Sequence, residues 1–340
     1  MRIALDAMGG DHAPAVVVTG ARDALRLYPG IERLFLVGDA AVVEAECEAH
    51  GLDDTRVAIV HAPETIAMNE SAVKAVRHKK KASVAVATDL VKAGDAEAVI
   101  SAGNTGAAVT AATLKLRLLK GVERAGIASP IPNENGLCNI IDAGANPEAK
   151  PAHLVGYAIM GAVYARHVLR VPEPTVGLMS NGEEDEKGTS FTKETFNLLK
   201  ALADSGRAPF TWVGNVEGHD LFTSKLDVCL CDGFTGNVVL KSCEATAKAI
   251  AKWMKEEFGR SPLRLAGAAL AQGAFRAVKE RTNYECYGGS PLLGVNGVCI
   301  IAHGGSSALA IQNAIRVASE SIRHGINPEI EAALESLRHV

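Results

Sequence analysis

The stretch Ala98-Val-Ile-Ser-Ala-Gly-Asn-Thr-Gly106 joins a short apolar run to a cluster of small and amide-bearing residues, and five other stretches repeat this pattern. The apolar runs are predicted to be buried strands, and a helical pattern follows most of them. Because parallel strands end at one edge of a doubly wound sheet, we expect all six clusters to line one cleft that binds an anion through backbone N–H groups. The other clusters are Ala7–His12, Asp142–Asn146, Ser180–Glu184, Asp232–Asn237 and Ala302–Ser307.

The alternation of strands and helices predicts an α/β fold, with a doubly wound, mostly parallel sheet between two helical layers. We expect the 340 residues to form one such α/β/α domain over residues 1–340. The region near 123–146 is a candidate join between two lobes, although no composition change marks a boundary there.

Composition and charge exclude several classes of protein. The net charge of −4 gives no electrostatic case for nucleic acid as a partner. No apolar run approaches the ~18 residues of a membrane span, and the first residues enter a strand without a signal peptide. The seven cysteines lack CxxC spacing, so we expect reduced, mostly buried thiols of a cytoplasmic protein.

The usual catalytic and cofactor motifs are missing from the sequence. It contains no P-loop, no GxGxxG followed by a ribose-binding acid, no HExxH and no GxSxG. We therefore expect no nucleotide cofactor, no metal site and no serine nucleophile. Glycine-rich loops without this machinery favour a reaction in which an inorganic anion is itself a reactant.

The first cluster places Gly9 and Gly10 where a strand meets its helix, followed by Asp11 and His12. The glycines allow backbone N–H groups to approach an anion, and His12 can transfer a proton. The alternative is a tight turn in which Asp11 caps the helix.

Three further clusters offer side-chain donors at helix starts. Gly103, Asn104 and Thr105 lie where a phosphate could meet a helix N-terminus, although Asn104 is also an ordinary N-cap residue. After Asp232 and Gly233, the Asn237 amide could donate to an oxyanion, with an Asx turn as the alternative. Asp142, His303 and Ser306 are additional substrate-binding candidates.

The densest charge cluster is Asn181–Gly188, which begins directly at a strand end. A solvated loop is the usual fate of such a run. Lys187, held among carboxylates near a helix start, could instead neutralise a phosphate or polarise a carbonyl oxygen. Asn181 and Glu183 are substrate-binding candidates in the same loop.

A helical tip is predicted over residues 255–285. Basic residues flank an apolar surface there, which fits an amphipathic membrane-surface helix or a helix buried in a dimer interface. The membrane or interface candidates are Leu263, Leu265, Ala266, Leu270 and Phe275.

Five ordered motifs resemble the bacterial phosphate acyltransferases of phospholipid synthesis, the PlsX family, and the match extends from residue 1 to about residue 320. The segment His303-Gly-Gly-Ser-Ser307 departs from the family pattern by one glycine. The motifs are Met1–Pro14, Ser101–Ala107, Asn181–Gly188, Asp232–Asn237 and Tyr287–Gly294.

The resemblance implies a fold related to phosphotransacetylases and isocitrate dehydrogenase, and transfer of a fatty acyl group from acyl carrier protein to inorganic phosphate. It places Lys187 and Asn237 at the reaction centre and makes His12 and Asn104 candidates in the same cleft. It further implies a homodimer that acts at the inner face of the cell membrane through the 263–275 tip. A membrane acyltransferase would use its product.

These expectations combine into a mechanism without covalent catalysis, in which a phosphate oxygen attacks a thioester carbonyl. Backbone amides near Gly9, Gly103 and Gly233, together with Asn104, would bind phosphate. Asn237 and Lys187 would interact with the carbonyl oxygen or with the attacking phosphate. His12 would give a proton to the leaving thiolate. The acidic carrier would dock on Lys79–Lys81 or on Arg264, Arg276 and Lys279.

Three other functions stay open at this point. A phosphotransacylase that uses acyl-coenzyme A would share the cleft and the chemistry. An NAD-dependent dehydrogenase would share the fold, but the missing GxGxxG counts against it. A non-catalytic membrane scaffold would explain the apolar tip but not six polar strand ends.

Overall fold

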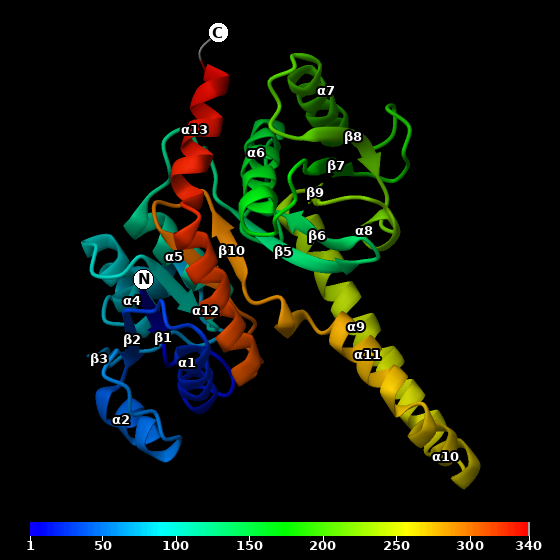
Figure 1. Cartoon of the computed structure of the whole chain (residues 1–340). Coiled ribbons are helices and arrows are strands. Elements are labelled where there is room, and N and C mark those ends of the chain that lie inside the picture. Colours follow the sequence, from blue (N-terminus) through cyan, green and yellow to red (C-terminus); the bar gives the residue numbers. More distant parts are fainter. Residues whose placement is uncertain (339–340) are drawn as a thin grey trace.

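A computed structural model describes residues 1–338 as an α/β protein built on one eleven-stranded sheet (Figure 1). The strands lie in the order β3-β2-β1-β4-β11-β10-β5-β6-β9-β7-β8. Their bounds are β1 Arg2–Asp6, β2 Arg33–Gly38, β3 Val57–His61, β4 Ala98–Ser101, β5 Gly126–Asn133, β6 Gly136–Ile141, β7 Thr175–Met179, β8 Thr211–Val216, β9 Val228–Leu230, β10 Ser290–Leu293 and β11 Val298–Ile301.

Helices cover both faces of this sheet, so the predicted mostly parallel α/β architecture is confirmed. Their bounds are α1 Ala15–Leu27, α2 Ala40–Ala49, α3 Ala72–His78, α4 Ser83–Ala93, α5 Thr105–Leu116, α6 Pro151–His167, α7 Ser190–Asp204, α8 Asp220–Thr223, α9 Gly233–Phe258, α10 Pro262–Leu270, α11 Gln272–Thr282, the 3-10 helix η1 Tyr284–Cys286, α12 Ala308–Arg323 and α13 Ile326–Arg338.

The strand directions correct the expectation that all six clusters share one edge. The pairs β10–β11, β10–β5 and β5–β6 are antiparallel, and every other pair is parallel. Strands β6, β7 and β9 therefore run opposite to β1, β4 and β11. The clusters after β1, β4 and β11 leave one rim of the sheet, and those after β6, β7 and β9 leave the other.

The elements that escaped the sequence prediction include α8, β10 and α13. Strand β10 is only four residues long, contains Pro291 and follows two glycines, so it lacks the pattern of an ordinary strand. Helix α13 follows α12 after His324 and Gly325, and Gly325 has a left-handed backbone conformation. The sequence predicted no helix after α12. Strand β10 is one of the elements that reverse the sheet direction.

Apolar clusters between the sheet and its helices form the core. On one face α1 and α12 pack on β1 and β4, where Gly20 permits close approach because an added Cβ would lie 2.6 Å from the Ala308 carbonyl oxygen. On the other face α4 and α5 cover the same strands. Helix α6 packs on β6, β7 and β9, α7 packs on β7 and β8, and α13 packs on α6.

Helices α9, α10 and α11 form an arm that projects from the body (Figure 1). The 26-residue α9 runs outward, and Ser261, whose hydroxyl accepts from Arg264 N at 3.2 Å, starts the return through α10. The helical tip expected over residues 255–285 contains the end of α9 followed by α10 and α11, which are separated at Ala271.

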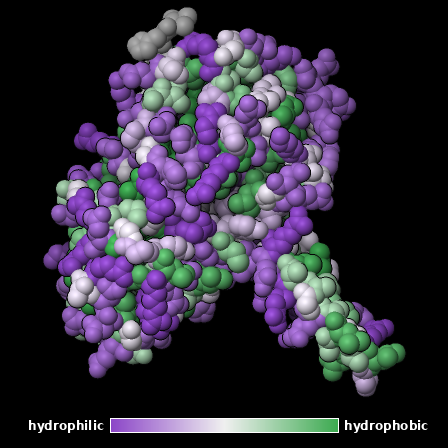
Figure 2. Space-filling view, in the orientation of Figure 1, coloured by the Kyte–Doolittle hydropathy of each residue, from purple (hydrophilic) through white to green (hydrophobic). Residues whose placement is uncertain are grey.

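Hydrophobic residues gather at the free end of the arm (Figure 2). Leu263 is 84% exposed and Leu270 is 90% exposed, and Leu265 and Ala266 are also exposed. Phe275 differs from these residues because it is half-buried against Phe258, with ring centroids 5.2 Å apart. Among residues 1–338, no helix is long and apolar enough to cross a bilayer.

Candidate active site

A cavity of about 600 Å³ lies along the inner part of the arm, between β5, α9 and the segment that leads from α11 into β10. Its wall is mostly apolar and includes Ile127, Pro130, Ile131, Leu240, Ala247 and Ala251. A long apolar groove of this kind suits an alkyl chain. The cavity is the best candidate for a substrate site in the described part of the chain.

Residues from both rims of the sheet meet at this cavity. Thr105, His303 and Ser306 come from the clusters after β4 and β11, while Ala143 and Asn237 come from the clusters after β6 and β9. The six clusters do not share an edge, but members of four of them share this cavity. The cavity therefore combines polar groups from both rims with a mostly apolar wall.

The first cluster supports the site without lining the cavity. Asp11 N donates to the Gly304 carbonyl oxygen at 2.8 Å, which ties the loop after β1 to the loop after β11. A Cβ on Gly9 would lie 2.8 Å from Gly103 N, so only glycine allows these loops to touch. Asp11 and His12 are exposed. The helix cap assigned to Asp11 as an alternative is wrong, because α1 starts after Pro14 without a side-chain cap.

The Asn104 side chain is used within the protein. Its Oδ1 accepts from Ala107 N at 3.0 Å as the cap of α5, and its Nδ2 donates to the carbonyl oxygens of Ala67, Met68 and Glu70. The capping alternative is therefore what the structure shows. Thr105, the next residue, lines the cavity.

Asp142 organises the loop after β6. It is fully buried, and its carboxylate accepts from the backbone nitrogens of Ile127, Gly144, Ala145 and Asn146 at 2.6–3.0 Å. Such a set of donors satisfies the buried charge. Asp142 thus shapes the loop that brings Ala143 to the cavity.

Asp232 and Gly233 fix the start of α9. Asp232 accepts from Thr235 N at 2.9 Å and from Thr235 Oγ1 at 2.7 Å, which is the predicted Asx cap. Gly233 N donates to the Asn146 carbonyl oxygen at 2.9 Å. Asn237, one turn further along α9, lines the cavity and faces Gly144, where an added Cβ would lie 3.6 Å from the Asn237 side chain.

The acidic loop after β7 lies outside the cavity lining. Asn181, Glu183 and Lys187 are exposed, and none of them is among the residues that line the cavity. The Lys187 side chain is 47% exposed and lies 3.9 Å from Glu184, a long contact that leaves its ammonium group largely in solvent. Strand β7 neighbours β9, so this loop leaves the same rim as the start of α9.

His303 adds a titratable group to the cavity wall. Its Nδ1 accepts from Gly305 N at 3.1 Å, which places the ring proton on Nε2, 3.8 Å from Glu244 Oε2. Burial lowers the pKa of His303, and Lys241 adds to this effect while Glu244 opposes it. A neutral imidazole that donates from Nε2 is therefore favoured near neutral pH.

Sequence reasoning missed the polar stripe of α9. Lys241, Glu244 and Lys248 line the cavity at a helical spacing of three and four residues, beside the apolar Leu240 and Ala247. That spacing was a usable signal for one helix face, but nothing in the sequence gives the direction of the face. Lys279 and Arg281 add positive charge from α11.

Cysteine chemistry is not favoured at this site. Cys243 lines the cavity, but burial and the neighbouring Glu244 raise the pKa of its thiol. A thiol with a raised pKa holds little thiolate at neutral pH, and the thiolate is the nucleophilic form. Burial likewise raises the pKa of Cys299 in β11 to about 12.

The fold and this cavity define an α/β enzyme with the architecture of the phosphotransacetylases. The chain is similar to a phosphotransacetylase from Streptococcus pyogenes, with a TM-score of 0.62 at 16% identity, over 94% of this chain and 93% of that one. A EutD phosphotransacetylase from Staphylococcus aureus gives a TM-score of 0.58 at 15% identity, over 99% of this chain and 94% of that one. At such identities the likeness shows the fold alone.

Sequence relatives give the family. The family described as "Fatty acid synthesis protein" matches residues 1–328. The phosphate acyltransferase of Akkermansia muciniphila is 59% identical over 337 residues, which cover 99% of this chain and 97% of that protein. The phosphate acyltransferase of Geobacter sulfurreducens is 47% identical over 336 residues, which cover 99% of this chain and 95% of that protein. The chain belongs to this family and is an acyltransferase.

Proposed function

We propose that this acyltransferase moves a fatty acyl group from the thioester of acyl carrier protein to inorganic phosphate and releases acyl phosphate for phospholipid synthesis. The observation that carries the proposal is the composition of the cavity. An apolar groove along α9 leads from the donors Thr105, Asn237 and Ser306 toward Lys248 and Lys279 on the arm. The apolar wall would hold an alkyl chain, and the donors would bind an oxyanion. The lysines would attract an acidic carrier.

The reaction needs no nucleophile from the protein. A phosphate oxygen attacks the thioester carbonyl carbon, the carbon–oxygen bond forms, and the tetrahedral intermediate expels the carrier thiolate. Positioning two reactants is worth several kcal/mol, up to about 7–11 in favourable cases. Neither a cofactor nor an acylated side chain is part of this scheme.

We assign the oxyanion to the Asn237 amide and the phosphate charge to Lys187. Asn237 lines the cavity one turn into α9, close to the helix N-terminus, which also favours negative charge. Lys187 acts from the loop after β7, and its weak contact with Glu184 leaves the ammonium group available. Backbone amides of the loops that carry Gly9, Gly103 and Gly233 would complete the phosphate site. The Gly103 amide donates to Ser101 Oγ and the Gly233 amide to the Asn146 carbonyl oxygen, so other amides of these loops would make the contact.

The proton for the thiolate is better assigned to His303 than to His12. His303 lines the cavity and donates from Nε2, whereas His12 is exposed at the rim outside the lining residues. A carrier thiolate is a good leaving group near neutral pH, so this proton transfer contributes modestly.

We further propose that the chain works in the cytoplasm as a homodimer at the inner face of the membrane and passes its product to a membrane acyltransferase. The exposed Leu263, Leu265 and Leu270 at the arm end support a transient membrane contact (Figure 2). The carrier would dock on the basic residues near the arm.

The experiment is a comparison of acyl donors. Purified protein receives radiolabelled inorganic phosphate with a long-chain acyl carrier protein or with the same acyl group on coenzyme A. We expect labelled acyl phosphate mainly from the carrier thioester. Transfer from coenzyme A alone would support the rival phosphotransacylase. A second sample without phosphate, analysed by mass spectrometry, tests for an acylated side chain, which would contradict direct attack.

A further inference from the structure

Three potential metal ligands meet outside the cavity. Glu183, from the loop after β7, lies with His219 and Asp220 at the start of α8, and one ligand atom from each is within 4.8 Å of the others. The sequence motifs predicted no metal site. Glu183 is far from the other two ligands in the chain and meets them only because β7 and β8 are neighbours in the sheet.

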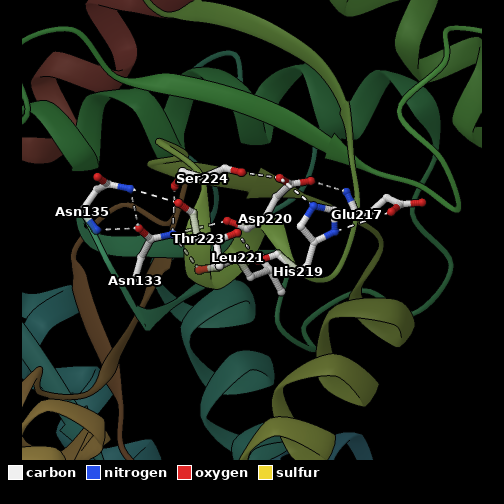
Figure 3. Close-up of polar contacts among 8 residues, drawn as sticks. All are labelled: Asn133, Asn135, Glu217, His219, Asp220, Leu221, Thr223 and Ser224. Carbon is white, nitrogen blue, oxygen red and sulfur yellow. Dashed lines mark hydrogen bonds and ion pairs between the residues drawn. The ribbon is translucent and has the colours of Figure 1, made fainter.

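The orientation of His219 is typical of a metal-binding imidazole. Its Nδ1 faces Glu217 Oε2 at 3.5 Å and its Nε2 faces Asp220 Oδ1 at 3.5 Å (Figure 3). Histidines that bind metals usually direct their other ring nitrogen at a carboxylate, which fixes the ring. Two ligands of a tetrahedral zinc ion stand roughly 3.3 Å apart when each bond is about 2.0–2.1 Å long. The spacing of Nε2 and Oδ1 is close to that value.

Asp220 is held in place from behind. Its carboxylate accepts from Glu217 N at 2.8 Å and from the Ser224 hydroxyl (Figure 3). The Asn133 side chain in turn donates to the carbonyl oxygens of Asp220, Leu221 and Ser224. These hydrogen bonds hold the Asp220 carboxylate and the turn around it in a fixed position.

Within residues 1–338 no lysine or arginine forms an ion pair with Glu217 or Asp220, whose ion-pair partner is His219. Lys200 pairs with Asp185, and the long 3.9 Å contact of Lys187 is made to Glu184. No ion pair or side-chain hydrogen bond within residues 1–338 involves the Glu183 carboxylate. Glu183, Glu217 and Asp220 therefore place three acids around one histidine, a charge balance that favours a cation.

We infer that Glu183, His219 and Asp220 form a binding site for one divalent transition-metal ion of the zinc class, with Glu217 orienting the imidazole. Mixed imidazole and carboxylate ligands suit Zn²⁺, Co²⁺ or Mn²⁺ better than Mg²⁺. An ion there would link the loop that carries Lys187 to the turn before α8. This inference does not depend on the proposed acyl transfer, because its test measures metal binding directly.

The test titrates the full-length protein, stripped with chelator, with Co²⁺ and Zn²⁺. We expect one Co²⁺ per chain with a visible d–d absorption, displacement by Zn²⁺, and much weaker binding of Mg²⁺. Hydrogen exchange should slow in residues 181–188 and 217–220 when Zn²⁺ is added. Absence of stoichiometric binding, or slowed exchange only elsewhere, would overturn the inference.

Variants separate the site from general metal affinity. His219→Ala should abolish the Co²⁺ spectrum, Glu183→Gln should weaken binding at least tenfold, and Glu217→Gln should weaken it about 10–100-fold as an orienting group. Glu186→Gln in the same loop is the matched control for the carboxylate. His50→Ala controls for loss of a histidine that pairs with one glutamate, at 3.1 Å.

Each result decides the question. If His219→Ala fails to fold, the exposed Glu183→Gln variant carries the test, since the Glu183 side chain makes no hydrogen bond or ion pair with the rest of residues 1–338. Unchanged Co²⁺ affinity in Glu183→Gln would overturn the ligand set. Equal losses in Glu186→Gln and Glu183→Gln would show that the whole acidic loop attracts cations without a defined site, which also contradicts the inference.

Discussion

Gly233 lies against Asp142 so closely that a Cβ on Gly233 would stand 2.7 Å from the Asp142 carboxylate. The same Cβ would also lie 2.8 Å from the Asn146 backbone. This contact joins the loop after β6 to the start of α9, although ninety residues of chain separate them. It sets the position of Asn237, one turn further along the helix.

The Gly233→Ala substitution should destabilise the protein. The Asp142 carboxylate is fixed by four backbone N–H groups and the Asn146 neighbour is backbone, so the backbone has to shift, and such overpacking costs about 1–3 kcal/mol. Urea unfolding measures the change. Gly156→Ala is the matched control, because nothing lies within 4 Å of its added Cβ inside α6, and it should leave stability equal or slightly higher. Equal stability of Gly233→Ala and wild type would show that the contact is not tight.

Removing the proposed oxyanion donor should slow turnover without unfolding. Asn237→Ala should lower kcat about 100–1,000-fold, as expected for one lost donor, and Lys187→Ala should also lower it strongly. Acyl-phosphate formation under saturating substrates gives kcat. Lys200→Ala, which removes an exposed lysine paired with Asp185, is the control. Near-normal kcat in both variants with intact folding would contradict the assignment.

Filling the apolar groove should change the preferred acyl length. Ala247 lines the cavity on α9, so Ala247→Trp should raise KM for long acyl donors several-fold more than for short ones. Ala245→Trp is the control, because Ala245 is exposed on the same helix and is not among the lining residues. A uniform effect on all chain lengths would place the acyl group elsewhere.

Stability should depend on pH through His303. Burial lowers its pKa in the folded state, so below the unfolded value of about 6.5 the unfolded chain binds more protons than the folded chain. The free energy of unfolding should therefore fall as the pH drops through 6.5 toward the folded pKa. Since the His303 side chain is 37% exposed, its share should stay well under the limit of about 1.4 kcal/mol per pH unit for one proton.

Urea unfolding at several pH values checks this dependence. His303→Asn should flatten the slope below pH 6.5, whereas His12→Asn at the exposed rim serves as the comparison. An identical slope in wild type and His303→Asn would rule out the histidine as its source.

The arm end should bind lipid surfaces through its leucines. Replacing Leu263 and Leu270 with Ser should lower binding to anionic vesicles at least tenfold, because burial of each leucine is worth about 1.5–3 kcal/mol when complete. Vesicle co-sedimentation measures the loss. Leu198→Ser, a 40% exposed leucine of α7 in the body, should have no effect. Unchanged co-sedimentation of the double variant would show that the two leucines do not mediate binding to the vesicles.

Much of the fold was predictable from local pattern. The strands before the six clusters formed where the sequence placed them, as did the caps at Asn104 and Asp232, which the sequence offered as alternatives to substrate binding. The candidate site was harder to predict. Thr105, Asn237, His303 and Ser306 reach the cavity, but the acidic loop with Lys187 does not.

The sequence by itself determined the local structure, since an N-cap bond such as that from Asp232 to Thr235 joins residues three apart and forms wherever the helix starts. Only the tertiary structure decided which clusters meet. The antiparallel pairs made by β10 and β5 send three of them to the opposite rim, and the pairing of β7 with β8 places Glu183 beside His219. Strand order depends on apolar burial summed over the whole sheet, so no short stretch of the chain could specify these contacts.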